Sequence, residues 1–138
     1  MIYLPDTNAF SAYLSGRSPA LAARMKTAFA AGQLRLSVIV ASEFAFGAEK
    51  ARRNMGETRF AKSVEALRKQ IEIEPLGSDF PRHYSRLRAD LEAAGRKIGD
   101  RDTIVAAHSL ALGATMVTAD VREFSRVPGL VVENWQTD

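Results

Sequence analysis

The stretch DTIVAAHSLALGATMVT, residues 102–118, holds the clearest structural pattern in the chain. Its first part, Asp102 to Leu112, is apolar or small at almost every position, which predicts a buried helix, and Gly113 is a residue type that commonly ends one. The run Thr115 to Thr118 then predicts a strand. A buried helix that leads directly into a short buried strand is typical of a parallel sheet covered by helices.

The same alternation continues on both sides of this stretch. Short apolar runs predict further strands at Ile2 to Leu4, Leu34 to Val38, Ile71 to Glu74 and Leu130 to Val132. Helical spacing predicts helices after Asp6, around Leu21, Met25 and Phe29, through Glu43, Phe44 and Gly47, along Phe60, Val64, Leu67 and Ile71, and along Tyr84, Leu87 and Leu91 up to Gly95. We therefore predict one α/β domain over residues 1–138, in three α/β/α layers around a parallel sheet of four or five strands.

The composition is that of a globular protein without disulfides or thiolate metal sites. The chain has 138 residues, 46% of them hydrophobic, and no cysteine, which is enough for one sizeable core. No apolar run approaches the ~20 residues that a membrane span needs, and the opening MIYLPD has no basic leader. We expect a soluble, cytoplasmic protein without membrane contact.

The charge balance favours phosphate-bearing partners to a small degree. The formal net charge is +3, and 14 of the 19 basic residues are arginine, whose planar side chain suits bidentate phosphate contacts. A base-composition bias of the genome explains the arginines equally well, so both interpretations stay open.

Four acidic residues stand where the predicted elements meet. Asp6 follows the first strand, Glu43 lies early in the helix after the second, Asp102 starts a helix, and Asp120 follows the fourth strand. Ligands of open parallel sheets bind at the carboxyl ends of the strands, so these acids are candidates for one shared site. Carboxylates without cysteine or histidine are the hard oxygen ligands that Mg²⁺ or Mn²⁺ prefers, and such ions support phosphodiester chemistry.

Each acid also has a structural explanation. An aspartate before a helix is a favoured cap, and this holds for Asp6 and for the pair Asp100 and Asp102. Glu43 is harder to explain in this way, because it stands among apolar residues, where a buried charge needs a partner or a metal.

Polar residues next to the acids allow two interpretations. They either orient ligands or waters for a metal site or form turns and helix caps, and the sequence does not decide between these roles for Thr7, Asn8, Ser37 and Thr118.

Other conspicuous residues favour structural roles. His108 lies on a strongly apolar helix, which indicates a core or interface histidine. Glu123 is explained by a solvent-facing ion pair with Arg122 or Arg126. Trp135 is expected to pack the last segment against the core.

Three segments resemble the PIN-domain toxins of the VapC type. They are YLPDTNAFSAYLSG (3–16), LSVIVASEFAFGAEKA (36–51) and IGDRDTIVAAHSLALGATMVTADVREFSRVPGLVVENW (98–135), in the order and spacing of that family. The intervening residues 51–95 match more weakly, chiefly at HYSRLRADLEAAG.

The resemblance implies a PIN-like fold and a Mg²⁺-dependent, or Mn²⁺-dependent, endoribonuclease. The family's strand-end aspartate falls on Asp6, its helix glutamate on Glu43, its second aspartate on Asp102 and its fourth acid on Asp120. These four are the expected catalytic and metal-binding residues. The resemblance further implies an RNA substrate, a homodimer, and a small antitoxin protein that silences the toxin by wrapping its groove.

The chain departs from the family pattern at two places. Pro5 replaces an aliphatic residue before Asp6 and removes an N–H group from a strand expected to be central. Asp100 adds an acid before Asp102, where we expect it to cap the helix. The family often has asparagine at the position of Asp120, so the resemblance allows Asp120 to assist a metal or a water without being a required ligand.

Two other functions compete with this interpretation. A phosphoacceptor domain needs adjacent acids after the first strand and a lysine after the last, but this chain has Pro5, Asp6 and Thr7 and no lysine beyond Lys97. A PIN fold that binds RNA or a partner without cleavage is the better alternative. Because all four acids are present, the sequence favours activity.

Overall fold

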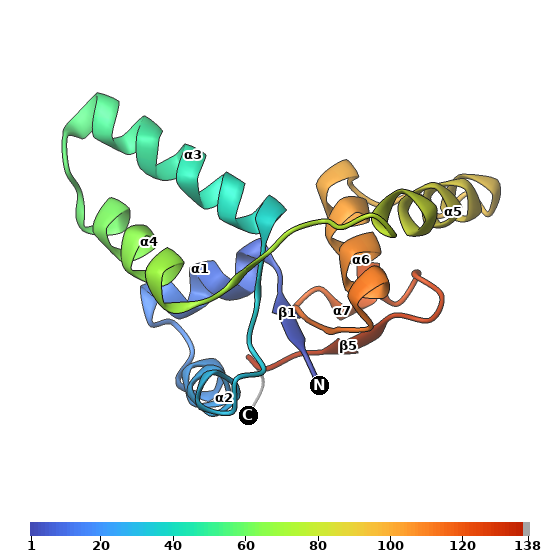
Figure 1. The fold of residues 1–138 in the computed structure, drawn as a ribbon, viewed down its shortest axis with the longest axis horizontal. Coiled ribbons are helices and arrows are strands. Elements are labelled where there is room, and N and C mark those ends of the chain that lie inside the picture. The colour runs from blue at the N-terminus through green and yellow to red at the C-terminus, as the bar shows by residue number, and fades with distance from the viewer. Residues whose placement is uncertain (137–138) are drawn as a thin grey trace.

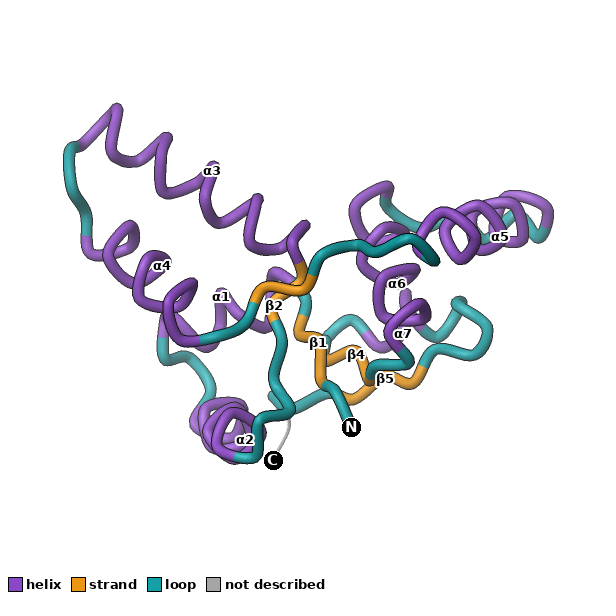
Figure 2. The backbone as a smooth tube through the Cα atoms, in the orientation of Figure 1, coloured by secondary structure: helices purple, strands orange, loops and turns teal. Residues whose placement is uncertain are grey.

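The computed structural model describes residues 1–136. Five strands and seven helices form over this range, and Figure 1 and Figure 2 show how they are arranged. The strands are β1 (Tyr3–Pro5), β2 (Leu36–Ser37), β3 (Ile73–Glu74), β4 (Thr115–Val117) and β5 (Val131–Glu133). The helices are α1 (Thr7–Ser15), α2 (Pro19–Ala30), α3 (Val38–Met55), α4 (Arg59–Gln70), α5 (Phe80–Ala93), α6 (Asp100–Leu112) and α7 (Val121–Phe124).

The strands are all parallel and form two ladders, β1-β4-β5 and β2-β3. A single bridge between Tyr3 and Leu34 joins them, with the Tyr3 N–H donating to the Gln33 carbonyl at 2.7 Å. The strand order across both ladders is therefore β3-β2-β1-β4-β5, with β1 in the middle. The predicted α/β fold with a parallel sheet of four or five strands is confirmed.

Pro5 fits the sheet because of the side on which its N–H group would lie. The Tyr3 N–H points toward the β2 side, and the Asp6 N–H donates to the Val117 carbonyl of β4 at 3.0 Å. Successive N–H groups of a strand alternate between its two neighbours, so the group missing at Pro5 would face β2. The bonding found on that side ends at Tyr3, whose carbonyl accepts the Arg35 N–H at 3.0 Å, so the proline lies just beyond the paired residues.

The helices end and pack largely as their sequences predict. α6 begins at Asp100, two residues before the predicted start, and Gly113 ends it in the left-handed conformation with φ of 64°, which glycine adopts without steric cost. α5 packs along α6, and α3 packs along α4 (Figure 1). Over residues 1–136, every helix is too short or too polar to traverse a lipid bilayer.

Two aromatic side chains that mark the helical spacing in the sequence are partly open to solvent. Phe29 of α2 is 49% exposed and Phe60 of α4 is 42% exposed. Trp135 is buried as predicted, in edge-to-face contact with Tyr3 at 4.9 Å between ring centroids. The last described segment is therefore held against the sheet.

Candidate active site

Asp6 is a buried carboxylate between β1 and α1, only 5% exposed. Its Oδ1 accepts the Ala9 N–H at 2.8 Å, which caps α1, and its Oδ2 accepts the Thr118 hydroxyl at 2.6 Å. Burial raises its pKa above the ordinary 3.8 despite these hydrogen bonds, and the negative charges of Asp120 and Glu43 raise it further. Asp6 therefore caps α1 and at the same time lies close to the other candidate acids.

Glu43 reaches the same place from α3. Its Oε2 accepts the Thr7 hydroxyl at 3.2 Å and lies 3.8 Å from the Arg101 guanidinium. Its side chain is 23% exposed. Thr7 begins α1 and Arg101 lies in the first turn of α6, so contacts from both helix starts hold the glutamate.

Asp102 lies in the first turn of α6, next to Gly99. A Cβ atom at Gly99 would stand 3.3 Å from Asp102 Oδ2, so a glycine leaves room for the carboxylate. Burial raises the pKa of Asp102 above 3.8, and the charges of the other three candidate acids add to the rise, while a hydrogen bond with Glu123 opposes it. The Gly99 N–H donates to Glu123 Oε1 at 3.3 Å.

Asp120 is exposed and stands at the edge of this group. Its Oδ1 accepts the Glu123 N–H at 3.2 Å and caps the short helix α7. Its own N–H donates to Thr118 Oγ1 at 3.0 Å. Thr118 therefore links Asp120 to Asp6 through one hydroxyl.

The acids surround an open cavity of about 410 Å³, which we call the acidic cavity. Its lining comes from the starts of α1 and α6 and from α3: Asp6, Thr7, Asn8, Glu43, Gly99, Asp100, Arg101, Asp102 and Val105. Three of the four candidate acids line it, and Asp120 contributes charge from the edge. Their catalytic roles stay a prediction.

The four flanking polar residues take different roles. Thr7 and Thr118 each donate to a carboxylate of the site, and Asn8 lines the acidic cavity. Ser37 is completely buried, caps α3 and lies 2.9 Å from His108 Nδ1. His108 is itself completely buried, with Nε2 2.9 Å from the Pro75 carbonyl, as expected of a core histidine.

Two interpretations from the sequence are wrong. Asp100 does not cap α6: the cap position is Gly99, no side chain bonds there, and Asp100 is exposed. Glu123 makes no ion pair with Arg122 or Arg126 within residues 1–136; it bonds to the Gly99 N–H and to Asp102. For Glu123 the competing contact is tertiary, because the backbone before α6 donates to its side chain.

Arg101 is a site residue that the sequence reasoning missed. It stands between two aspartates, and this acid-base-acid order at a helix start is the signal that was available. Its guanidinium is the cation nearest Glu43 among the ion pairs of residues 1–136.

The donor set fits a hard divalent cation. Within residues 1–136, no three aspartate, glutamate or histidine side chains already stand in a geometry that holds a metal ion. Mg²⁺ does not require such a cage, because it keeps several waters and binds through one or two carboxylates together with substrate phosphates. Carboxylates that raise one another's pKa in a cavity gain from a cation there.

Comparisons with known proteins agree with this geometry. Residues 3–130 match the family model described as PIN domain. The chain is 28% identical to Ribonuclease VapC2 of Rickettsia felis over 98% of both chains, and 33% identical to the tRNA(fMet)-specific endonuclease VapC of Shigella flexneri over 75% of this chain and 76% of that one. A solved structure of VapBC2 from Rickettsia felis, bound to a DNA fragment from its promoter, superposes with a TM-score of 0.87 at 27% identity, covering 98% of this chain and 99% of that one.

Proposed function

Since this chain belongs to the PIN-domain family and to its VapC group of ribonucleases, we propose that it is a Mg²⁺-dependent endoribonuclease and the toxin of a toxin–antitoxin pair. The observation that carries the proposal is the acidic cavity. Asp6, Glu43 and Asp102 line it from three separate parts of the chain.

When bound, a divalent ion supplies Lewis acidity toward a phosphoryl oxygen and lowers the pKa of a water for attack on the phosphodiester bond. Other residues of the protein orient the acids and are placed to contact the substrate. The hydroxyl of Thr118 fixes Asp6, and the hydroxyl of Thr7 fixes Glu43. Arg101 lines the cavity beside Glu43, where its guanidinium is placed to contact a phosphate of the substrate.

The proposed partners follow from the family. We infer an RNA substrate in the cytoplasm, a homodimer, and a small antitoxin protein that covers the toxin's groove. The similarity to a VapBC complex over nearly the whole chain supports the antitoxin.

A binding module without catalysis is the alternative function. Such a protein has no need of the full set of acids. This chain retains Asp6, Glu43, Asp102 and Asp120. Burial raises the pKa of Asp6 and of Asp102, and the charges of neighbouring candidate acids raise it further. We therefore favour the enzyme.

A cleavage assay on the purified protein tests the proposal. Wild type should cleave single-stranded or loop RNA with Mg²⁺ or Mn²⁺ and stop in excess EDTA. Asp6→Asn should lose at least about a hundredfold in rate, since loss of a ligand exceeds the effect of losing a residue that only orients one. Asp90→Asn is the matched control, because Asp90 is exposed on α5. Undiminished cleavage in EDTA would contradict the metal mechanism.

Growth after induction gives the second test. Without an antitoxin, wild type should stop growth, and Asp6→Asn should not. Equal toxicity of the two proteins would exclude Asp6 from the catalytic site.

A further inference from the structure

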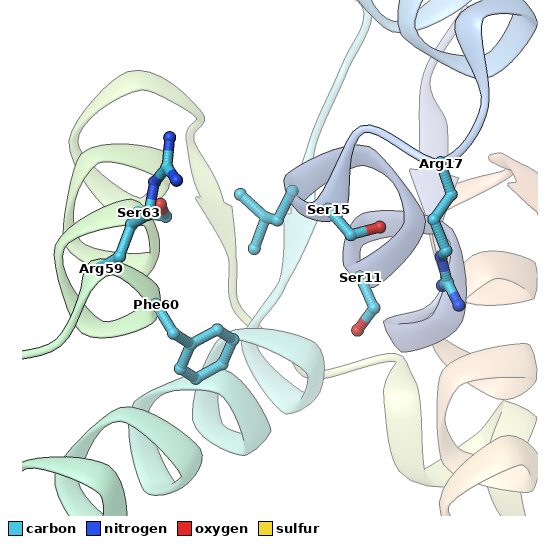
Figure 3. A pocket seen from close by; sticks show the side chains of 7 residues that line it. Ser11, Ser15, Arg17, Arg59, Phe60 and Ser63 are labelled. Carbon is cyan, nitrogen blue, oxygen red and sulfur yellow. The ribbon is translucent and has the colours of Figure 1, made fainter. Parts of the chain in front are cut away.

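A second open cavity, of about 470 Å³, lies between α1 and α4, and we call it the α1–α4 groove. Figure 3 shows the side chains around it, which are Arg59, Phe60 and Ser63 from α4, Ser11 and Ser15 from α1, and Arg17 just after α1. Leu14 completes the lining. The groove thus combines two arginines, three hydroxyls and one aromatic ring.

The groove and the acidic cavity are both lined by residues of α1. Thr7, Ser11 and Ser15 are spaced four residues apart, so they lie on one face of the helix in steps of about 6 Å. Thr7 lines the acidic cavity, and the two serines line the groove. A third cavity, of about 510 Å³, shares Asn8 with the acidic cavity and Arg17 with the groove. The three hollows therefore follow one another around the same helix.

The charge of the groove is opposite to that of the acidic cavity. No aspartate or glutamate lines it, and Arg17 and Arg59 are exposed. The ion pairs found among residues 1–136 use other arginines, including Arg52 and Arg68 on the neighbouring helices. Two guanidinium groups are thus available to an anion, and phosphate is the anion they match best.

Phe60 adds a stacking surface. Its ring lies against α3, where a Cβ atom at Gly47 would be 3.5 Å from Phe60 Cε2 and where the Phe44 ring centroid is 6.4 Å away. The side chain is nevertheless 42% exposed and lines the groove. Grooves for single-stranded nucleic acid combine positive charge with aromatic rings on which bases stack.

We propose that single-stranded RNA extends from the acidic cavity into the α1–α4 groove, where Arg17 and Arg59 contact its phosphates and Phe60 stacks on a base. This inference rests on the proposed function and adds a binding surface to it. The charge favours RNA over a protein segment as occupant, because the lining offers cations and hydroxyl donors and a third cavity shares one residue with the groove and one with the acidic cavity.

Salt-dependent binding of a fluorescein-labelled oligouridylate tests the proposal. The measurements use full-length protein with Mg²⁺ in the Asp6→Asn background, so that the RNA stays intact. For single strands, each lost phosphate contact lowers the slope of log K against log salt by about 0.7. The double variant Arg17→Gln/Arg59→Gln should therefore lower the slope by about 1.4.

Two further variants separate the contributions. Phe60→Leu keeps an apolar side chain against α3 and should weaken binding about tenfold with the slope unchanged, since stacking releases no counterions. Arg86→Gln on α5 removes the same charge from an exposed position outside the groove and should change neither quantity. Thermal melts check that each variant is folded.

The outcomes distinguish this inference from the proposed function. If wild type cleaves RNA but the arginine double variant keeps the wild-type slope, or changes no more than Arg86→Gln, the inference is wrong, the ribonuclease stands, and the groove is left for a protein partner. If wild type neither binds nor cleaves RNA with Mg²⁺, both are wrong. In the active background, the groove variants should raise KM for the oligouridylate while leaving kcat near the wild-type value.

Discussion

Asp6 and His108 are both almost completely buried and ionisable, yet their surroundings differ. His108 contacts two uncharged groups, the Ser37 hydroxyl and the Pro75 carbonyl, and burial lowers its pKa below 6.5. Both ring nitrogens of the neutral imidazole therefore have a hydrogen-bond partner. Asp6 also has two hydrogen-bond donors, but it faces other carboxylates, and burial raises its pKa.

This difference separates a structural polar group from a functional one. A buried group whose partners match its neutral form supports the fold without any ligand. Acids brought together in a cavity repel one another as long as they are charged. We therefore expect a cation to stabilise the acidic cavity, whereas His108 already has hydrogen-bond partners for its neutral form.

Among changes to the surroundings of these two residues, the largest effect should come from removing the hydroxyl that orients Asp6. Thr118→Val leaves Asp6 Oδ2 without its donor, and loss of such a supporting contact typically lowers activity about 10–100-fold. Because this hydrogen bond lowers the pKa of Asp6, its loss should also move the acidic limb of the pH–rate profile to higher pH. Thr118→Ser keeps the hydroxyl and should have the wild-type rate and the wild-type pH–rate profile. An unshifted profile in Thr118→Val would show that the ionisation of Asp6 does not control the cleavage rate.

An intermediate effect, on stability alone, is expected at His108. His108→Leu leaves the Ser37 hydroxyl and the Pro75 carbonyl buried without this partner, which should lower the free energy of unfolding by about 2 kcal/mol. Urea denaturation measures this change. The cleavage rate per folded molecule should stay at the wild-type value, and a large loss of rate would give His108 a role in the site.

The pH dependence of stability gives a second test of His108, namely whether the fold lowers its pKa. Because the fold lowers the pKa of His108, its contribution to stability is complete above pH 6.5 and is lost as pH falls below 6.5 toward the folded-state value. Wild type should therefore lose stability in this window more steeply than His108→Leu. Parallel curves for the two proteins would contradict the assignment.

The smallest effect should be a gain in stability from Asp102→Asn in EDTA. The fold raises the pKa of Asp102, so its charge costs stability as pH rises above 3.8 through the folded-state value. Asparagine carries no such cost, and the variant should melt a few degrees higher than wild type at neutral pH. The difference should vanish in acid, where Asp102 is protonated.

Mg²⁺ should reverse the order of the two proteins or reduce the gap, because an ion that binds only the folded state stabilises it. A less stable variant, together with a wild type indifferent to Mg²⁺, would make Asp102 a structural residue.

The sequence predicts the fold well because apolar periodicity reports burial directly. The helix and strand of residues 102–118 lie where that pattern places them, within two residues. The convergence of Asp6, Glu43 and Asp102 was also predictable, since the carboxyl ends of parallel strands share one edge.

Side-chain partners were less predictable, because they depend on contacts between distant segments. Ser37 and Thr118 are both hydroxyl residues after a strand, but one contacts His108 and the other Asp6. Glu123 bonds to Gly99, 24 residues away in the chain. The spacing of residues along the chain does not predict which distant residue each of these side chains contacts.

Mn²⁺ binding tests the central claim most directly, namely that the acidic cavity binds a divalent cation. Electron paramagnetic resonance of free Mn²⁺ measures binding without any need for turnover. Wild type should remove the free-ion signal at the Mn²⁺ concentrations that support RNA cleavage, Asp6→Asn should bind at least about tenfold more weakly, and Asp90→Asn should bind like wild type. A wild type that leaves Mn²⁺ free while it cleaves RNA, or an Asp6→Asn protein that binds as tightly as wild type, would contradict the account.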